Sequence, residues 1–176
     1  MSGLRAGWVV GVLGVVLAVS GGCGVVGGEP EVVPLEERSS VEDARASLDE
    51  MTAQMRDALV AEFPEGSWSM AKGHGTAPGA VAFEGMDAIE VSSELWGFDR
   101  SVASGQDRDR AVEVVSQIGE RHGFGELQIY VEHDDSFQSI AWNASGDNYR
   151  FGSQERATLT YRTSPRLSAE QLASIG

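Results

Sequence analysis

The strongest constraint on the fold of this chain is a change in apolar spacing at Leu127. From there to residue 161, apolar residues alternate with polar ones in four short stretches, and polar turns such as 145–148 separate the stretches. Alternation with a period of two is typical of strands with one buried face, and short polar turns join antiparallel neighbours. The pattern therefore predicts an antiparallel β-meander with one apolar and one polar face. Its expected apolar positions are Leu127, Ile129, Val131, Ile140, Trp142, Ala144, Tyr149, Phe151, Ala157, Leu159 and Tyr161.

Two stretches before the meander have apolar residues three and four positions apart, the spacing of amphipathic helices. The first begins at Ser39 or Ser40, each of which has an acidic residue three positions later as in a capping box, and it ends before Pro64. The second has the acidic residues of 107–110 in its first turn and is closed by Gly123. Because the apolar sheet face needs a cover, we expect an α+β fold. This fold is a two-layer sandwich of the antiparallel sheet packed against two helices.

The patterns are weaker between the helices and after the meander. The sequence predicts a strand over 67–72, a glycine-rich loop over 73–79, a second strand over 80–84 and an irregular third strand within 89–98. The loop lacks the Lys and the Ser or Thr of a phosphate-binding loop, so we expect its His74 to face solvent. Ser168 and Gln171 have the spacing of a cap for a short last helix.

The N-terminal residues indicate export from the cytoplasm. A short cationic start with Arg5 is followed by an unbroken apolar block over 8–19 and by small residues over 20–22. This order is typical of a signal peptide. The block is shorter than the about 20 apolar residues that a membrane-spanning helix needs. We therefore interpret residues 1–22 as a signal peptide and not as a lasting membrane span.

The only cysteine of the chain, Cys23, directly follows Gly21 and Gly22. This arrangement resembles the lipobox of bacterial lipoproteins, although Ser20 stands where that pattern usually has Leu. The resemblance implies cleavage between Gly22 and Cys23, acylation of the Cys23 thiol and attachment to the extracytoplasmic face of the cell membrane. Two alternatives stay open. An ordinary signal peptidase could cut after Ser20 and release a soluble secreted protein, or the segment could stay uncleaved as an anchor.

The composition of the rest of the chain indicates a tether and one domain, and it argues against a nucleic-acid partner. Glycine, proline and glutamate dominate 23–39, which predicts a flexible tether, and we expect a single domain over 40–176. The alternative is that Val32, Val33 and Leu35 dock on the domain. The formal net charge of −14 opposes binding to phosphate backbones, so we expect no nucleic-acid partner.

One family combines these features in the same order. The chain resembles the LppA-like lipoproteins of actinobacterial cell envelopes in five features. They are a signal with Cys23, a capped helix that ends at Pro64, a second helix, the Tyr149-Arg150-Phe151 triplet and the 157–160 strand. The similarity covers most of residues 40–164. Family members often carry an additional pair of cysteines, which this chain lacks. The resemblance implies an extracytoplasmic α+β lipoprotein, and it supplies no catalytic residues.

Candidate catalytic residues are few. His133, Asp134 and Asp135 could hold a metal or relay protons, but consecutive residues in a turn point apart, and Asp is common in turns for local hydrogen bonds. We therefore predict no catalytic residue, metal or other cofactor. The alternative is a small hydrolytic or metal-dependent enzyme built on His133 and Asp135 or on His74.

A binding role is the favoured interpretation. We expect a non-enzymatic module that organises the envelope or binds an envelope protein, glycan or lipid through exposed aromatic side chains. The candidate binding residues are Trp68, Trp96 and Tyr130, whereas we expect Trp142 to lie in the core.

Overall fold

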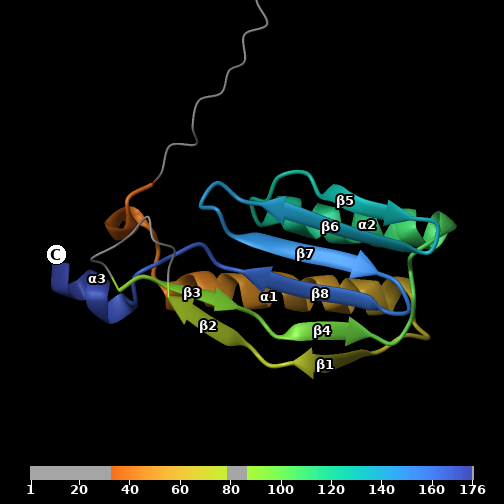
Figure 1. The fold of residues 1–176 in the computed structure, drawn as a ribbon, viewed down its shortest axis with the longest axis horizontal. Coiled ribbons are helices and arrows are strands. Elements are labelled where there is room, and N and C mark those ends of the chain that lie inside the picture. The colour runs from red at the N-terminus through yellow and green to blue at the C-terminus, as the bar shows by residue number, and fades with distance from the viewer. Residues whose placement is uncertain (1–32, 79–86, 176) are drawn as a thin grey trace, which may run out of the picture. The chain divides into compact units, whose positions relative to one another are not determined.

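The computed structural model describes residues 33–78 and 87–175, and it has the expected two layers (Figure 1). Helices α1 (Val41–Glu62) and α2 (Gly105–Arg121) lie side by side against one face of an antiparallel sheet. Buried side chains from both helices and from the sheet form one apolar cluster between the layers. The α+β sandwich is therefore confirmed. The predicted signal peptide, the Gly22 to Cys23 cleavage site and the predicted strand over 80–84 lie outside the described residues.

The sheet is antiparallel throughout, and the C-terminal meander forms one side of it, with β5 at the edge. Its strands are β1 (Trp68–Lys72), β2 (Gly75–Pro78), β3 (Ile89–Ser92), β4 (Leu95–Phe98), β5 (Gln128–His133), β6 (Ser136–Trp142), β7 (Asn148–Ser153) and β8 (Ala157–Arg162). The main order is β1-β4-β8-β7-β6-β5, and β2 joins through β3, which also pairs with β8. The meander β5 to β8 is thus confirmed, with β4 beside its last strand.

The helix ends follow local chemistry. Ser40 is the N-cap of α1, and its hydroxyl accepts a hydrogen bond of 3.1 Å from the backbone N–H of Asp43. The second of the two predicted capping frames is therefore the one in use. After α2, Gly123 takes a φ of +81°, a conformation that suits glycine past a helix end. The short helix α3 (Ala169–Ile175) follows Ser168, whose hydroxyl accepts from the backbone of Gln171.

The described part of the predicted tether packs against the domain. Leu35, in a short 3₁₀ helix (Leu35–Glu37), is buried with Ala88 and Leu167. The Arg38 guanidinium donates a hydrogen bond of 3.0 Å to the carbonyl of Pro165. For Leu35, the docked alternative is the one observed.

Two predictions for the middle of the chain are wrong. The predicted loop over 73–79 contains strand β2, which pairs with β3 over four residues. The single irregular strand expected within 89–98 is two strands, because Ser93 and Glu94 separate β3 from β4. The Ser93 hydroxyl accepts from the Tyr161 N–H at 2.9 Å, so a partner distant in sequence stabilises this break.

The predicted face of β6 is also wrong for Trp142, which is 46% exposed. The residues of β6 that face the helices and are buried are Phe137, Ser139 and Ala141. Their register partners in β7 are buried as well. Ser139 tolerates this place because its hydroxyl donates to the Phe151 carbonyl at 2.6 Å. A satisfied polar residue therefore occupies the inner face, and Trp142 lies on the outer one.

Two buried tyrosines face each other across β7 and β8 but differ in their hydrogen bonds. The Tyr161 hydroxyl donates to Asp49 at 2.6 Å, whereas the Tyr149 hydroxyl has no partner among the described residues. Burial raises the pKa of both phenols, which therefore stay neutral at physiological pH.

Replacing Tyr149 with Phe is therefore expected to raise the free energy of unfolding by about 1 kcal/mol, because a desolvated hydroxyl without a partner is removed. Replacing Tyr161 with Phe is the matched control. It should lower the free energy of unfolding by about 1 kcal/mol, because the bond to Asp49 is lost. Urea unfolding of both variants measures the difference. A loss of stability in Tyr149→Phe as large as that in Tyr161→Phe would contradict the assignment.

Candidate functional site

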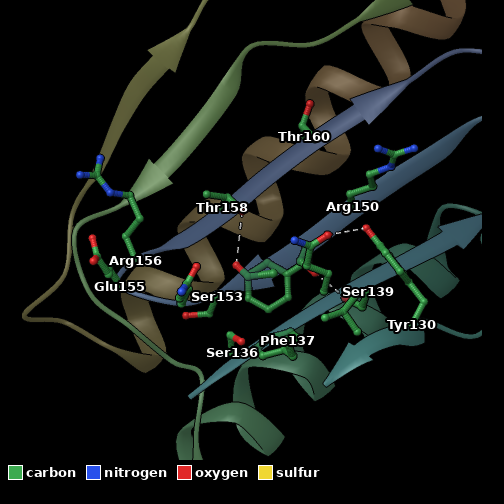
Figure 2. Close-up of a pocket in the computed structure, with 15 residues that line it drawn as sticks. Tyr130, Ser136, Phe137, Ser139, Arg150, Ser153, Glu155, Arg156, Thr158 and Thr160 are labelled. Atoms are coloured by element: carbon green, nitrogen blue, oxygen red, sulfur yellow. Dashed lines mark hydrogen bonds between the residues drawn. The ribbon is translucent and has the colours of Figure 1, made fainter. Parts of the chain in front are cut away.

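The uncovered face of the sheet carries a hollow of about 430 Å³ over β6, β7 and β8 (Figure 2). The helices occupy the opposite face, so no described helix covers this hollow (Figure 1). We call it the open-face groove. Its lining consists mostly of hydroxyl, amide and guanidinium side chains from the strands and from the turn between β7 and β8.

The floor of the open-face groove is low because small residues meet there. One row of register partners crosses the strands β6, β7, β8 and β4. It consists, in that order, of Gln138, Gly152, Thr158 and Gly97. A Cβ on Gly152 would lie 2.8 Å from the carbonyl oxygen of Phe137, so the strand requires glycine at this position. Two glycines in four neighbouring positions leave room for a ligand near the backbone.

One wall of the groove is the ring of Tyr130. The register of β5 shifts between Ile129 and Val131, so Tyr130 has no register partner in β6. Its side chain is 52% exposed, and its hydroxyl donates a hydrogen bond of 2.8 Å to the amide oxygen of Gln138. Figure 2 shows this bond at the Arg150 side of the groove. The bond positions an exposed aromatic ring.

Two exposed arginines lie at opposite ends of the lining, Arg150 on β7 and Arg156 in the turn before β8, with Thr158 between them (Figure 2). Within the part of the chain that the structure describes, neither forms an ion pair or a side-chain hydrogen bond. Glu155 is the carboxylate in the lining, and it is exposed as well. The groove therefore presents more positive than negative charge in an acidic protein.

Three residues that line the groove have hydroxyls with backbone partners, and two of them, Ser139 and Ser153, are buried on the inner face of the sheet. Ser139 donates to Phe151, Thr158 donates to the Gly152 carbonyl at 3.5 Å, and Ser153 accepts from the Val102 N–H at 2.9 Å. None of these is paired with a base that could activate it as a nucleophile. The arrangement suits hydrogen bonding to a ligand better than covalent chemistry.

The structure does not bring the three predicted binding residues together. Trp68 and Trp96 lie on the helix side, where the Trp68 indole donates to the Arg56 carbonyl at 3.1 Å. The Arg56 guanidinium lies 3.8 Å from the centre of the Trp96 ring. Of the predicted set, Tyr130 alone lines the open-face groove.

The predicted catalytic alternatives lie apart from the groove. His133 and Asp135 are exposed at the turn between β5 and β6, so they face solvent and no cleft. His74 lies 3.6 Å from Glu94 and is half exposed. Within residues 33–78 and 87–175, no three His, Cys, Asp or Glu side chains form a group that could hold a metal ion.

A second hollow of about 330 Å³ lies beside a buried ion pair that the sequence did not predict. The Arg166 guanidinium and the Asp147 carboxylate are 2.7 Å apart, with side chains only 3% and 5% exposed. Asp147 also accepts from the Asn143 amide at 3.0 Å and from the Ser164 N–H at 2.8 Å. Arg166 donates to the Ser39 hydroxyl at 2.9 Å.

This pair joins the turn between β6 and β7 to the start of α1 and to the segment after β8. Burial by itself would raise the pKa of Asp147. The hydrogen bonds from Asn143 and Ser164 and the charge of Arg166 outweigh it and hold the pKa below its ordinary value. Asp147 and the two terminal nitrogens of Arg166 have internal partners, whereas the buried Arg166 Nε has none among the described residues. Because the two charges neutralise each other inside the domain, we assign the pair a structural role.

Sequence reasoning missed Arg150 and Arg156, although a signal was present. Arg150 stands between Tyr149 and Phe151 in an alternating strand, which places it on the polar face. Arg156 lies in the turn two positions before Thr158 of the next strand. Two arginines on one face of an acidic protein could have been singled out as a candidate site.

Comparison with known proteins identifies the family. The family model named LppA, described as "Lipoprotein confined to pathogenic Mycobacterium", matches residues 32–169. The chain belongs to the LppA family. Membership in the LppA family confirms the resemblance inferred from the sequence and establishes a lipoprotein family for this chain.

Two solved structures share the LppA-family fold. The crystal structure of LppA from Mycobacterium tuberculosis aligns with a TM-score of 0.63 at 18% identity over 78% of this chain and 84% of that chain. A DUF4853 family protein from Actinomyces odontolyticus aligns with a TM-score of 0.60 at 14% identity over 79% of this chain and 75% of that chain. At these identities the similarity shows the fold alone. No curated protein matches the chain significantly.

Proposed function

We propose that this LppA-family protein is a lipid-anchored, extracytoplasmic binding module that contacts an envelope partner through the open-face groove. The observation that carries the proposal is the asymmetry of the sheet. One face is covered by α1 and α2, and the other is hollowed and presents a fixed aromatic ring and two arginines that have no side-chain partner among the described residues. A hollow with convergent polar groups is the usual location of a binding site.

The proposed anchor rests on Cys23 and on the lipoprotein family. The sequence from Arg5 to Cys23 has the order of a lipoprotein signal, and the family model is that of a lipoprotein. Among the helices of residues 33–78 and 87–175, none is long and apolar enough to cross a membrane. We propose that acyl chains on Cys23 hold the protein at the extracytoplasmic face.

The proposed non-enzymatic role rests on the chemistry of the groove. The hydroxyls of Ser139, Ser153 and Thr158 have backbone partners. The charged groups of the lining are two arginines and one glutamate. Arginine stays protonated at any physiological pH, so it binds and orients anions but does not act as an ordinary general base. These side chains favour recognition over proton transfer.

Photo-crosslinking from the groove tests this function in cells of the native host. A photoreactive residue at Gln138 or Gln154, both exposed in the open-face groove, is expected to give crosslinks to an envelope component. The same residue at Gln117, exposed on α2, is the matched control and should give none. Crosslinks of equal yield from Gln117, or no crosslinks from either groove position, would refute binding through this face.

A further inference from the structure

We infer that the ligand of the open-face groove is an acidic glycan, a sugar polymer that carries carboxylate or phosphate groups. This inference rests on the proposed function and specifies its partner. Three observations carry it: the charge of the groove, the separation of its two arginines, and the absence of an accessible backbone edge on its floor.

The charge of the groove departs from that of the protein. The formal net charge of the chain is −14. The lining of the groove, in contrast, contains two arginines, Arg150 and Arg156, and one carboxylate, Glu155. Every other described arginine has an ion pair, a hydrogen bond or an aromatic ring as a partner, namely Arg38, Arg45, Arg56, Arg100, Arg108, Arg110, Arg121, Arg162 and Arg166. An exposed arginine without a partner is unremarkable alone. Two that line the same hollow indicate a site for anions.

The two arginines stand apart on the sheet. Arg150 is the register partner of Thr160, and the side chain of Arg156 lies against Gly97, where an added Cβ would be 3.4 Å from the Arg156 Cδ. β7 and β4 are separated by β8, and the partners of Arg150 and Gly97 in β8, Thr160 and Thr158, lie two residues apart along that strand. Standard strand spacings put Arg150 and Gly97 about 12 Å apart. This separation suits repeated acidic groups on a polymer better than one small anion.

The surroundings of the arginines favour a sugar over a peptide. Strands β6, β7 and β8 are each paired on both sides, so the floor offers no free backbone edge to which an acidic peptide could add as a strand. The floor instead presents the hydroxyl of Thr158 and the amide of Gln138, and the Tyr130 ring gives an apolar surface for the C–H groups of a sugar. Guanidinium groups bind carboxylate and phosphate with paired hydrogen bonds.

The test uses the purified full chain in detergent and two acidic polysaccharides. Polygalacturonate supplies carboxylates and phosphomannan supplies phosphates, and their neutral counterparts are methyl-esterified polygalacturonate and dephosphorylated mannan. Titration at low salt is expected to show binding of at least one acidic polymer. Its neutral counterpart should bind at least about tenfold more weakly, because one charged hydrogen bond contributes about 1.5 kcal/mol or more. Binding should also weaken as salt is raised.

Variants assign the binding to the groove. Arg150→Gln and Arg156→Gln are each expected to weaken binding about tenfold or more, because each loses a charged donor. Arg121→Gln, the matched control, removes the same charge from the exposed end of α2 and should change binding less than about twofold. Glu155→Gln should strengthen binding, because it removes the carboxylate that repels the ligand. Circular dichroism verifies that each variant is folded.

Several outcomes would overturn the inference. Equal binding of acidic and neutral polymers, binding of neither acidic polymer, or an equal loss in Arg121→Gln would each do so. Tighter binding of poly-L-glutamate would indicate a peptide ligand, and tighter binding of phosphatidylglycerol vesicles would indicate a lipid surface. If crosslinks from Gln138 and Gln154 persist in any of these cases, the ligand class is wrong but binding through the groove stands. If those crosslinks are absent as well, the proposed function itself is wrong.

Discussion

Replacing Cys23 with serine is expected to transfer nearly all of the protein from the membrane fraction to the soluble fraction of native-host cells. The proposed thioether needs the sulfur of the only cysteine in the chain, and a serine hydroxyl does not replace it. Each buried CH₂ of an acyl chain contributes about 0.8 kcal/mol to membrane binding, so the loss of two or three chains removes the anchor. No helix in the described part of the chain is long and apolar enough to cross a membrane. Cell fractionation with immunoblotting measures the change.

Ser20→Leu is the control for this experiment. It brings the segment closer to the usual lipobox, so the protein should stay in the membrane fraction. Intact mass of the native protein gives an independent measurement, since lipidation predicts a chain that begins at Cys23 with added acyl mass. Purified native protein that begins at Gly21 with an unmodified thiol would refute the anchor and favour the soluble secreted alternative.

Elements that depend on local sequence were predictable. The start of α1 follows from Ser40 and Asp43, three positions apart, and the end of α2 follows from Gly123, because caps involve neighbours in the chain. The meander was predictable for the same reason, since each of its strands pairs with the next across a short turn. These contacts require no knowledge of the distant parts of the chain.

Elements that depend on distant partners were not predictable. Strand β2 lies in a glycine-rich stretch and exists as a partner of β3, and β4 pairs with β8, about 60 residues later in the chain. The inner face of β6 was missed because Ser139 is polar, and its bond to the Phe151 carbonyl becomes apparent only when β7 lies beside it. Trp142 was consequently assigned to the wrong face.

The same division applies to the candidate site. The outward position of Arg150 follows from strand periodicity and could be expected from the sequence. Alternation also predicts that Tyr130 faces away from Val131, but the register shift in β5 brings both into the lining of the groove. The groove itself could not, because it forms where β4, β6, β7 and β8 bring Gly97, Gly152 and Thr158 into one row. Trp68 and Trp96 face α1 because their register partners are the buried Phe98 and Leu159 of the inner face.

Breaking the buried ion pair is expected to have the largest effect on stability. Arg166→Met should lower the free energy of unfolding by about 3–5 kcal/mol, because Asp147 then remains a buried charge without its cation. Asp147→Asn should lower it by a similar amount, because the buried Arg166 then remains a cation without its anion. Arg45→Gln removes an exposed pair with Asp49 and is the matched control, with an expected loss below about 1 kcal/mol. Urea unfolding measures all three.

The pH dependence of unfolding separates loss of this pair from a simple packing defect. The pKa of Asp147 is lower in the folded than in the unfolded protein, so its contribution to stability is present above pH 4. That contribution is lost as the pH falls from the unfolded pKa of about 4 through the folded pKa, because protonation favours the unfolded state. In Asp147→Asn this contribution is absent, so the free energy of unfolding should fall less between pH 5 and pH 2 than in the unmodified protein. Parallel pH profiles for the two proteins would show that Asp147 is not held ionised by Arg166 and its hydrogen bonds.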